Sequence, residues 1–204
     1  MEGGSYRMKR IVIATKNEGK LREMRNTFSH LPVEAAALSD FGDLPDAVED
    51  GETFLENARI KARFFMEQTG CACIADDSGL EIAALDGAPG VHSARFAGFH
   101  ADDETNNKKL ITELQRLGLE SSAADYRCVL VFVDTDGTEI SAEGRCDGVV
   151  RLRPHGTNGF GYDPYFYITE HRTMADLSAE EKEAVSHRGK ALRQIASRLE
   201  GYLK

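Results

Sequence analysis

A polar stretch at residues 15–20 (TKNEGK) separates an apolar run from a helical pattern. A turn from a buried strand into a helix directs backbone N–H groups and the positive end of the helix dipole to one spot, which suits a phosphate. Thr15 and Asn17 can donate hydrogen bonds, and Lys20 adds a positive charge. The stretch lacks the GxxxxGK[ST] pattern of a Walker loop, and an ordinary polar turn with solvated lysines is the alternative.

Two acidic stretches offer oxygen ligands for a divalent cation. Glu49 lies before the predicted helix at residues 53–69, where helix electrostatics does not account for it. Asp76 and Asp77 follow a strand-like run, and we expect them at the C-terminal end of that strand, where ligands of open α/β sheets gather. Adjacent carboxylates repel each other, and Mg²⁺ would relieve that repulsion. A purely structural turn at residues 76–79 is the alternative.

Aromatic and basic side chains gather in the last third of the chain. Three glycines in residues 156–164 let backbone approach a ligand closely, and Phe160 and Tyr162 offer ring faces on which a nucleobase could stack. The SHRG stretch at residues 186–189, with Lys182 shortly before it, reads as a ligand-facing junction between two helical pieces. A solvated basic face is the alternative for these cations.

The apolar spacing predicts the elements that must position these side chains. It favours strands at residues 11–14, 33–38 and 72–75 and helices at 21–31, 53–69, 102–117 and 190–203. Asp136-Gly137 predicts a hairpin between strands 126–133 and 138–145, which residues 149–152 could extend. Helices alternate with strands early and a hairpin comes late, so we predict an α/β fold with a mixed central sheet and flanking helices.

Composition narrows the classes of function. The 204 residues carry a net charge of −9, which disfavours a nucleic-acid groove, and their 41% hydrophobic content can build one domain over residues 8–204. No apolar stretch reaches transmembrane length. The four cysteines form no CxxC pair, which favours a reducing, cytoplasmic location. We expect residues 1–7 to be a disordered extension or a remnant of cloning.

Taken in order, five stretches resemble the inosine/xanthosine triphosphate pyrophosphatase family. They are ATKNEGKLREM, EDGETFLENARIKA, IADDSGLEIAALDGAPGVHSARFAG, GTNGFGYDPYF and LSAEEKEAVSHRGKAL, in a single register from about Lys9 to Leu203. The resemblance implies a homodimer with a two-lobed α/β fold around a nucleotide-binding cleft. It also implies Mg²⁺ and hydrolysis of the damaged purine nucleotides ITP, dITP and XTP to the monophosphate and pyrophosphate, which would cleanse the nucleotide pool.

The resemblance also assigns roles to residues. Asp77 would accept a proton and, with Glu49, bind the metal. The predicted substrate-binding residues are Thr15, Lys16, Asn17, Glu18, Gly19, Lys20, Ser78, Phe160, Gly161, Tyr162, Asp163, Lys182, His187 and Arg188. Lys16 departs from the pattern of many relatives, which have Gly at that position.

Two other functions compete with this interpretation. A regulatory module that senses nucleotides without cutting them would be expected to lack a carboxylate at Glu49 or Asp77, and both are present. A Maf-type pyrophosphatase would act on other nucleotides, and the SHR and FGYD stretches argue against it. His187 and Arg188 can donate to the 6-oxo group of hypoxanthine or xanthine, whereas the 6-amino group of adenine would leave such donors unpaired.

Overall fold

The computed structural model describes residues 8–204, so the extension predicted at residues 1–7 lies outside the described part. Its strands are β1 Lys9–Ile13, β2 Val33–Ala37, β3 Ala72–Ile82, β4 Ser121–Val133, β5 Glu139–Arg151 and β6 Phe166–Tyr167. Its α-helices are α1 Glu18–Phe28, α2 Phe54–Thr69, α3 Asp103–Arg116, α4 Ala179–Val185 and α5 His187–Tyr202. Within residues 8–204, every helix is too short or too polar to cross a membrane.

The six strands form one mixed sheet in the order β2-β1-β3-β4-β5-β6. β1 runs parallel to both of its neighbours, with Ile13 opposite Ala37 of β2 and Ile74 of β3. β5 and β6 pair antiparallel at the other edge. The predicted α/β class with a mixed sheet and flanking helices is therefore confirmed.

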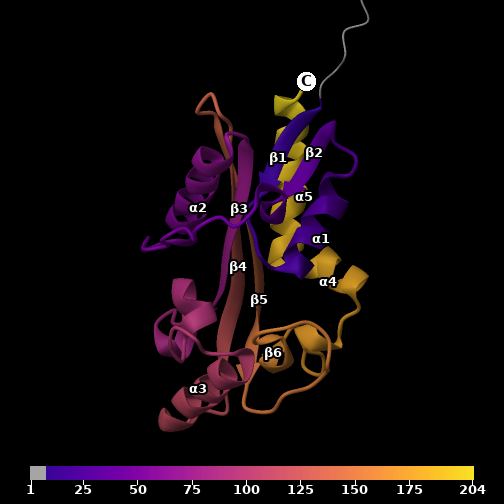
Figure 1. Cartoon of the computed structure of the whole chain (residues 1–204). Helices are drawn as coiled ribbons and strands as arrows, with labels where there is room; N and C mark the ends of the chain where they lie inside the picture. The colour runs from indigo at the N-terminus through magenta and orange to yellow at the C-terminus, as the bar shows by residue number, and fades with distance from the viewer. Residues whose placement is uncertain (1–7) are drawn as a thin grey trace, which may run out of the picture. The chain divides into compact units, whose positions relative to one another are not determined.

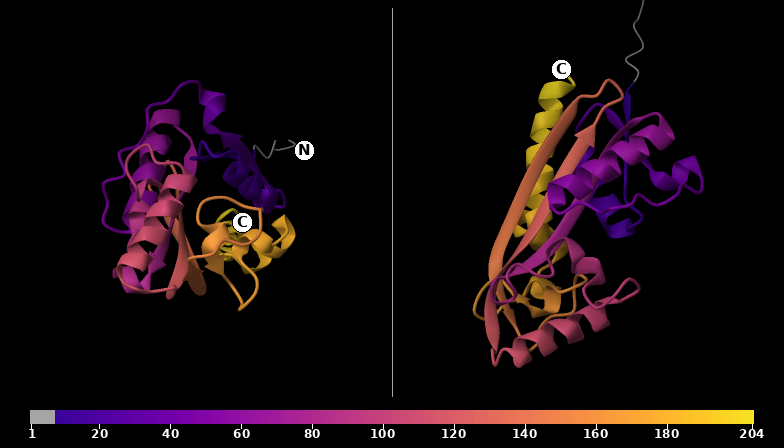
Figure 2. Two further views of the ribbon diagram at one scale, coloured as in Figure 1. Left: turned by 90° about the horizontal axis from the view of Figure 1, so that it is seen from below. Right: turned by 90° about the vertical axis from the view of Figure 1, so that its left-hand side faces the viewer.

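The chain divides into two compact units. The first holds the described residues up to Asp76 together with Val129–Ala142 and Leu192–Lys204. Within it, α2 and the C-terminal part of α5 lie on opposite sides of the strands, as both Figure 1 and Figure 2 show. Its core is apolar and closed to solvent, and includes Ile11, Val12, Ile13, Met24, Ala58, Ala62, Ile74, Leu130, Phe132, Ile195 and Leu199.

The second unit holds Asp77–Cys128 and Glu143–Ala191. α3 begins where the side chain of Asp102 accepts a hydrogen bond from the Thr105 amide, and it packs beside the short 3-10 helix η3 (Gly90–Arg95) (Figure 1). The core of this unit joins buried side chains of β3, α3, β4, β5 and the region around β6. The prediction of a single domain over residues 8–204, and the cleft that the resemblance implies, stay predictions.

Several sequence-based boundaries need correction. β3 continues through Asp76 and Gly79 instead of ending there, because Leu80 and Ile82 alternate into the core of the second unit and keep the strand extended. Residues 149–152 are no separate extension, since most of them belong to β5, and α5 begins at His187. The predicted hairpin is confirmed, with Gly137 in the left-handed region that its turn requires (φ 90°).

The first turn of α5 lies against β5 backbone to backbone. A Cβ atom added to Gly144 would meet the carbonyl oxygen of His187 at 2.0 Å and the amide of Ala191 at 2.7 Å. Both distances are far inside van der Waals contact, so only glycine fits at this position. The close approach sets the position of the helix that carries His187 and Arg188.

We expect Gly144→Ala to lower the free energy of unfolding by about 1–3 kcal/mol or more, because the added methyl group must displace backbone. Gly201→Ala is the matched control: it lies in α5 with nothing within 4 Å of the added Cβ. We expect this control to gain about 0.5–1 kcal/mol from helix propensity. Urea unfolding of both variants measures the difference, and equal stability would contradict the predicted close approach.

Candidate active site

A pocket of about 230 Å³ in the first unit gathers three lysines and three carboxylates. We call it the lysine pocket and define it by Lys16, Lys20, Asp46, Glu49, Lys61 and Asp76. Four of these residues, Lys16, Lys20, Glu49 and Asp76, were singled out from the sequence, and the structure brings them together. Thr15 also lines the pocket, so the turn after β1 contributes as expected.

Each lysine of the lysine pocket pairs with a carboxylate. The distances between nitrogen and oxygen are 2.6 Å for Lys16–Asp46, 2.7 Å for Lys20–Asp76 and 2.9 Å for Lys61–Glu49. Lys61 Nζ also donates to the backbone carbonyl of Asp76 at 3.0 Å. The pairs differ in burial, since the side chain of Asp76 is 2% exposed whereas that of Asp46 is 82% exposed.

The turn between β1 and α1 is ordered by its own polar groups. The side chain of Asn17 caps α1 by accepting from the amide of Lys20 at 3.0 Å, and Thr15 Oγ1 accepts from the Asn17 amide at 3.1 Å. The cap uses the side-chain oxygen of Asn17 and leaves its side-chain NH₂ group as a donor. Glu18 and Gly19 begin the first turn of the helix. The predicted strand–turn–helix arrangement is confirmed, and it directs Lys20 toward β3.

A second ordered segment positions Glu49 ahead of α2. The amide of Gly51 donates to Oδ1 of the buried Asn57 at 2.8 Å, and a Cβ on Gly51 would meet the side chains of Glu56 and Asn57 inside 3.0 Å. Thr53 and Glu56 complete a capping box at the start of the helix. Glu56 therefore serves the helix start, and Glu49 remains the acidic residue of this segment that reaches the lysine pocket.

The lysine pocket can exchange its internal ion pairs for a ligand that carries both charges. A polyphosphate would take over the ammonium groups, and a divalent cation would take over the carboxylates. The hydrogen bond to Asp46 raises the pKa of Lys16 above its ordinary value, which keeps this lysine protonated. The pocket is thus charged and preformed, with little cost of gathering the cations when a ligand arrives.

Asp76 and Asp77 do not form the repelling pair that the sequence suggested. Successive side chains of a strand point to opposite faces, and both residues lie inside β3. Asp76 pairs with Lys20 in the lysine pocket, whereas Asp77 is half-buried and its Oδ1 accepts from the amide of Ser78 at 3.1 Å. The repulsion argument for a metal is therefore wrong, and the charge of Asp76 is balanced by lysine.

A second cluster of predicted residues lies in the second unit. We call it the Phe160 group and define it by Phe160, Asp163, Lys182, His187 and Arg188. The buried Asp163 carboxylate pairs with Lys182 at 2.5 Å and accepts from the Phe160 amide at 3.0 Å. The Lys182 ammonium lies 4.8 Å and the Arg188 guanidinium 5.7 Å from the centre of the Phe160 ring. Phe160 is 44% exposed, so this aromatic residue beside two cations is accessible to a ligand.

The buried Tyr126 contacts two members of the Phe160 group, His187 and Asp163. Its ring stacks on the imidazole of His187 with centroids 4.7 Å apart and planes 12° apart, and its hydroxyl donates to Asp163 at 3.2 Å. Burial, and then the neighbouring Asp163 carboxylate, raise the pKa of Tyr126 well above its ordinary value. The phenol therefore stays protonated and fixes both the imidazole and the carboxylate.

The expectation that Tyr162 offers a stacking face is wrong. Its ring is buried in the core of the second unit, and its hydroxyl donates to the carbonyl of Ser93 at 2.7 Å. Gly161 and Ser78, the remaining predicted residues, lie in the loop after Phe160 and in β3 respectively. Tyr162 anchors this loop to the core, and Phe160 supplies the exposed ring.

Sequence reasoning missed Asp46, Lys61 and Tyr126 as parts of these clusters. Lys61 is only 17% exposed, but its place in α2 one helical turn after Asn57 gives no sign of this on the sequence. Asp46 lies in an irregular segment, where no spacing rule relates it to Lys16. Tyr126 alternates with other core residues of β4 and reads as an ordinary apolar position.

The donor set fits Mg²⁺ only as an ion that arrives with a phosphate. Among residues 8–204, no group of three or more His, Cys, Asp or Glu side chains could hold a metal ion by itself. Mg²⁺ is commonly bound through one or two carboxylates together with substrate phosphates and water. The Glu49 carboxylate in the lysine pocket meets that requirement.

Comparison with known proteins places the chain in a family. The Ham1 family model matches residues 11–198. This chain belongs to the Ham1 family. It is 48% identical to a dITP/XTP pyrophosphatase of Syntrophobacter fumaroxidans, over 95% of this chain and 83% of that protein. It is 47% identical to a dITP/XTP pyrophosphatase of Geobacter sulfurreducens, over 94% of this chain and 97% of that protein.

Solved structures of Ham1 proteins share the fold. A HAM1 protein from Coxiella burnetii matches with a TM-score of 0.88 and 42% identity, over 94% of this chain and 98% of that one. The Ham1 protein of Staphylococcus aureus matches with a TM-score of 0.86 and 37% identity, over 95% of this chain and 100% of that one. The family that the sequence resembles is therefore confirmed.

We expect Lys20→Met to weaken binding of inorganic tripolyphosphate by about tenfold or more, because a hydrogen bond to a charged group is lost. The matched control is Arg63→Met, which removes one positive charge from α2 at an exposed position paired with Glu139. Calorimetry on the two Ham1 variants should show less than about a twofold change in the control. Equal weakening in both would contradict a specific role of the lysine pocket.

Proposed function

We propose that this Ham1 protein hydrolyses the damaged purine nucleoside triphosphates ITP, dITP and XTP to the monophosphate and pyrophosphate, and so cleanses the nucleotide pool. The observation that carries the proposal is the lysine pocket, in which three ammonium groups converge after the β1–α1 turn. A triphosphate carries about four negative charges, which the ammonium groups of the pocket together with an accompanying Mg²⁺ would offset. The relatives named dITP/XTP pyrophosphatase support the same substrate class.

The phosphates would bind by exchanging partners within the lysine pocket. Lys16 and Lys61 would leave their carboxylates for phosphate oxygens, Lys20 would reach a phosphate oxygen while it keeps its buried partner Asp76, and the amide groups of the β1–α1 turn would add hydrogen bonds. Glu49 would then face a cation and no longer an ammonium. Phosphoryl chemistry depends mainly on such positioning and charge stabilisation.

Asp77 is the residue that we propose as proton acceptor for the attacking water. It is half-buried at the point of β3 where the second unit begins, and one of its oxygens is oriented by the Ser78 amide. By the resemblance, Asp77 would also join Glu49 in holding Mg²⁺ once a nucleotide is bound. When bound, Mg²⁺ neutralises phosphate charge and lowers the pKa of bound water.

We expect Asp77→Asn to abolish turnover of ITP while the protein remains folded, because the amide can neither accept the proton nor neutralise a cation. Steady-state rates and far-UV circular dichroism of the variant and the parent measure both parts. Asp147→Asn is a control of equal charge at a 76% exposed position. A near-normal rate in Asp77→Asn would refute the proposed role.

The nucleobase would bind at the Phe160 group. The exposed Phe160 ring offers a stacking face, and base–aromatic stacking contributes about 1–3 kcal/mol. His187 is held on Tyr126 and Arg188 is 4% exposed, so both donors are fixed and largely desolvated. Fixed donors satisfied by a 6-oxo group would be left unpaired by the 6-amino group of adenine.

We expect Arg188→Ala to lower kcat/KM for ITP much more than for ATP, narrowing the ratio of the two by about tenfold or more. The reason is that only the 6-oxo substrate uses the guanidinium as a base reader. If Arg188 instead binds phosphate, both substrates lose activity equally and the ratio is unchanged. Kinetics of ITP and ATP on one preparation of the variant separate these outcomes.

A substrate panel tests the proposed function directly. ITP, XTP, dITP, ATP, GTP and dUTP are offered with Mg²⁺, and released pyrophosphate is converted to phosphate by added inorganic pyrophosphatase and then measured. We expect ITP, XTP and dITP to be turned over far faster than ATP. Binding without release would favour the nucleotide-sensing module, and preference for dUTP or another standard nucleotide would favour a Maf-type activity.

The remaining expectations extend the proposal. We propose that the protein acts as a homodimer in the cytoplasm, without a nucleic-acid or membrane partner. The net charge of −9 argues against a nucleic-acid partner, and four cysteines without a disulfide favour a reducing compartment, while the homodimer rests on the resemblance alone. Light scattering coupled to size-exclusion chromatography measures the oligomeric state.

A further inference from the structure

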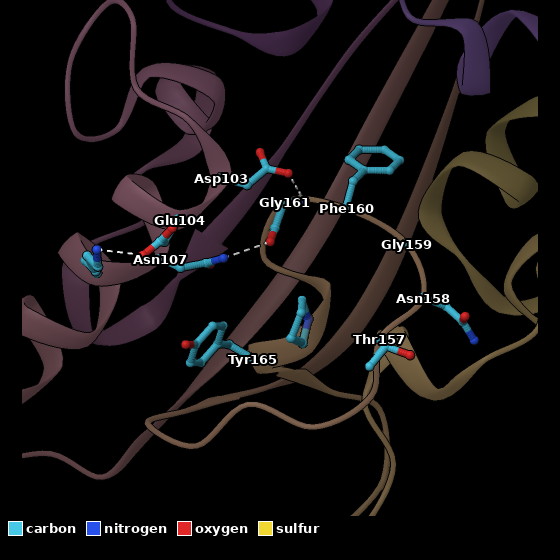
Figure 3. A pocket seen from close by; sticks show the side chains of 11 residues that line it. Asp103, Glu104, Asn107, Thr157, Asn158, Gly159, Phe160, Gly161 and Tyr165 are labelled. Carbon is cyan, nitrogen blue, oxygen red and sulfur yellow. Dashed lines mark hydrogen bonds and ion pairs between the residues drawn. The ribbon is translucent and has the colours of Figure 1, made fainter.

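The loop that carries Phe160 is held by α3 at one residue, Gly161, through the two peptide groups that flank it. Asp103 Oδ2 accepts a hydrogen bond from the Gly161 amide at 2.7 Å, and Asn107 Nδ2 donates to the Gly161 carbonyl at 2.9 Å. Asp103 and Asn107 are one helical turn apart, so they lie on one face of α3. Figure 3 shows both side chains reaching Gly161, while the Phe160 ring points elsewhere.

Hydrogen bonds set the spacing between α3 and this loop, because the space beside them is open. A pocket of about 420 Å³ is lined by Asp103, Asn107, Phe160, Gly161 and Tyr165 (Figure 3). Close packing normally fixes the distance between a helix and a loop. Here the two hydrogen bonds to Gly161 lie at the rim of this open pocket, so they and not packing set the distance.

The helix that holds the loop is itself firmly anchored. The side chain of Asn106 accepts from the Ala97 amide at 2.8 Å and donates to the Ala94 carbonyl at 3.1 Å. Lys109 Nζ donates to the carbonyl of Phe96 at 2.6 Å. These contacts make the first two turns of α3 a fixed support.

The burial of the Asn107 side chain is unfavourable in free energy, which argues for a role beyond stability. Its side chain is buried, and its Oδ1 has no hydrogen-bond partner among residues 8–204. The opposite orientation of the amide would place that oxygen against the Gly161 carbonyl. An unsatisfied buried acceptor is unfavourable, so the bond to Gly161 is maintained at the expense of packing that an apolar residue would provide.

We propose that Asp103 and Asn107 are positioning residues that fix the Phe160 ring for the nucleobase. The inference rests on the proposed function. The Phe160 residue is too exposed to be held by packing alone, so its place beside Lys182 and Arg188 depends on how its backbone is held, by Asp163 at its own amide and by α3 at the adjoining Gly161. Loss of the bonds to α3 should loosen the base site and leave the lysine pocket as it is.

The test uses Asp103→Ala, with Glu104→Ala as a matched control in the same helical turn. Glu104 carries the same charge but, in the part of the chain that the structure describes, pairs only within α3, with Lys108 at 2.7 Å. We expect Asp103→Ala to raise KM for ITP about three- to tenfold with little change in kcat, the effect of one hydrogen bond. Inhibition by inorganic tripolyphosphate, which has no base, should remain within about twofold of the parent.

Two further variants separate positioning from general stability. Asp103→Asn keeps an oxygen acceptor for the Gly161 amide and should restore most of the affinity, whereas Asn107→Ala should reproduce the defect of Asp103→Ala. Urea unfolding identifies any variant that is simply less stable. Equal KM values for Asp103→Ala and Glu104→Ala, or parallel loss of tripolyphosphate inhibition, would overturn the proposal.

Failure of the proposed function can be distinguished from failure of the positioning proposal. If the parent protein does not hydrolyse ITP, the activity itself is refuted, and amide hydrogen exchange still tests the support of the loop. We expect faster exchange at Phe160 and Gly161 in Asp103→Ala and parental exchange in Glu104→Ala. Unchanged exchange in Asp103→Ala would refute the support by α3 whatever the activity of the parent.

Discussion

The ion pair between Lys20 and Asp76 is the contact on which the candidate site depends. It joins the first helix to the central strand β3 and buries a carboxylate whose side chain is 2% exposed. A buried carboxylate needs a partner, because its desolvation costs several kcal/mol. The same pair keeps the Lys20 ammonium group beside the β1–α1 turn, where a phosphate would be held. Lys20 therefore has one role in the resting fold and another in the proposed complex.

In the proposed function, the two clusters divide the chemistry of a nucleotide. The lysine pocket is polar and lies after a turn that supplies amide groups, so it suits phosphate. The Phe160 group combines an exposed ring with fixed donors on a buried Tyr126 support, so it suits a base. Selectivity and charge neutralisation can therefore be changed by separate substitutions.

Long periodic elements were predictable from the sequence, and local geometry was not. The helices that became α2 and α3 follow from apolar spacing with Thr53, Gly70 and Asp102 at their ends. Residues 76–79 look like a turn because Asp, Ser and Gly favour turns, but the core positions Leu80 and Ile82 keep the strand extended. Tertiary packing overrode local propensity there.

The parts of the candidate site that lie within the five ordered sequence stretches were predictable. The β1–α1 turn, Glu49, Asp163 and Lys182 follow from the ordered stretches, and the structure groups the first two in the lysine pocket and the last two in the Phe160 group. Lys61 was not found, because the contact joins residues that are distant in sequence. Tyr162 was misassigned because an aromatic residue beside glycines reads as exposed, whereas its ring belongs to the core.

The position of bond cleavage tests the central claim most directly. A completed reaction of ITP with the protein and Mg²⁺ is followed by phosphorus NMR, which distinguishes pyrophosphate from inorganic phosphate and IMP from IDP. Our account predicts IMP and pyrophosphate in equal amounts, because the triphosphate is held for attack between the α and β phosphates. IDP and inorganic phosphate as the main products would contradict it.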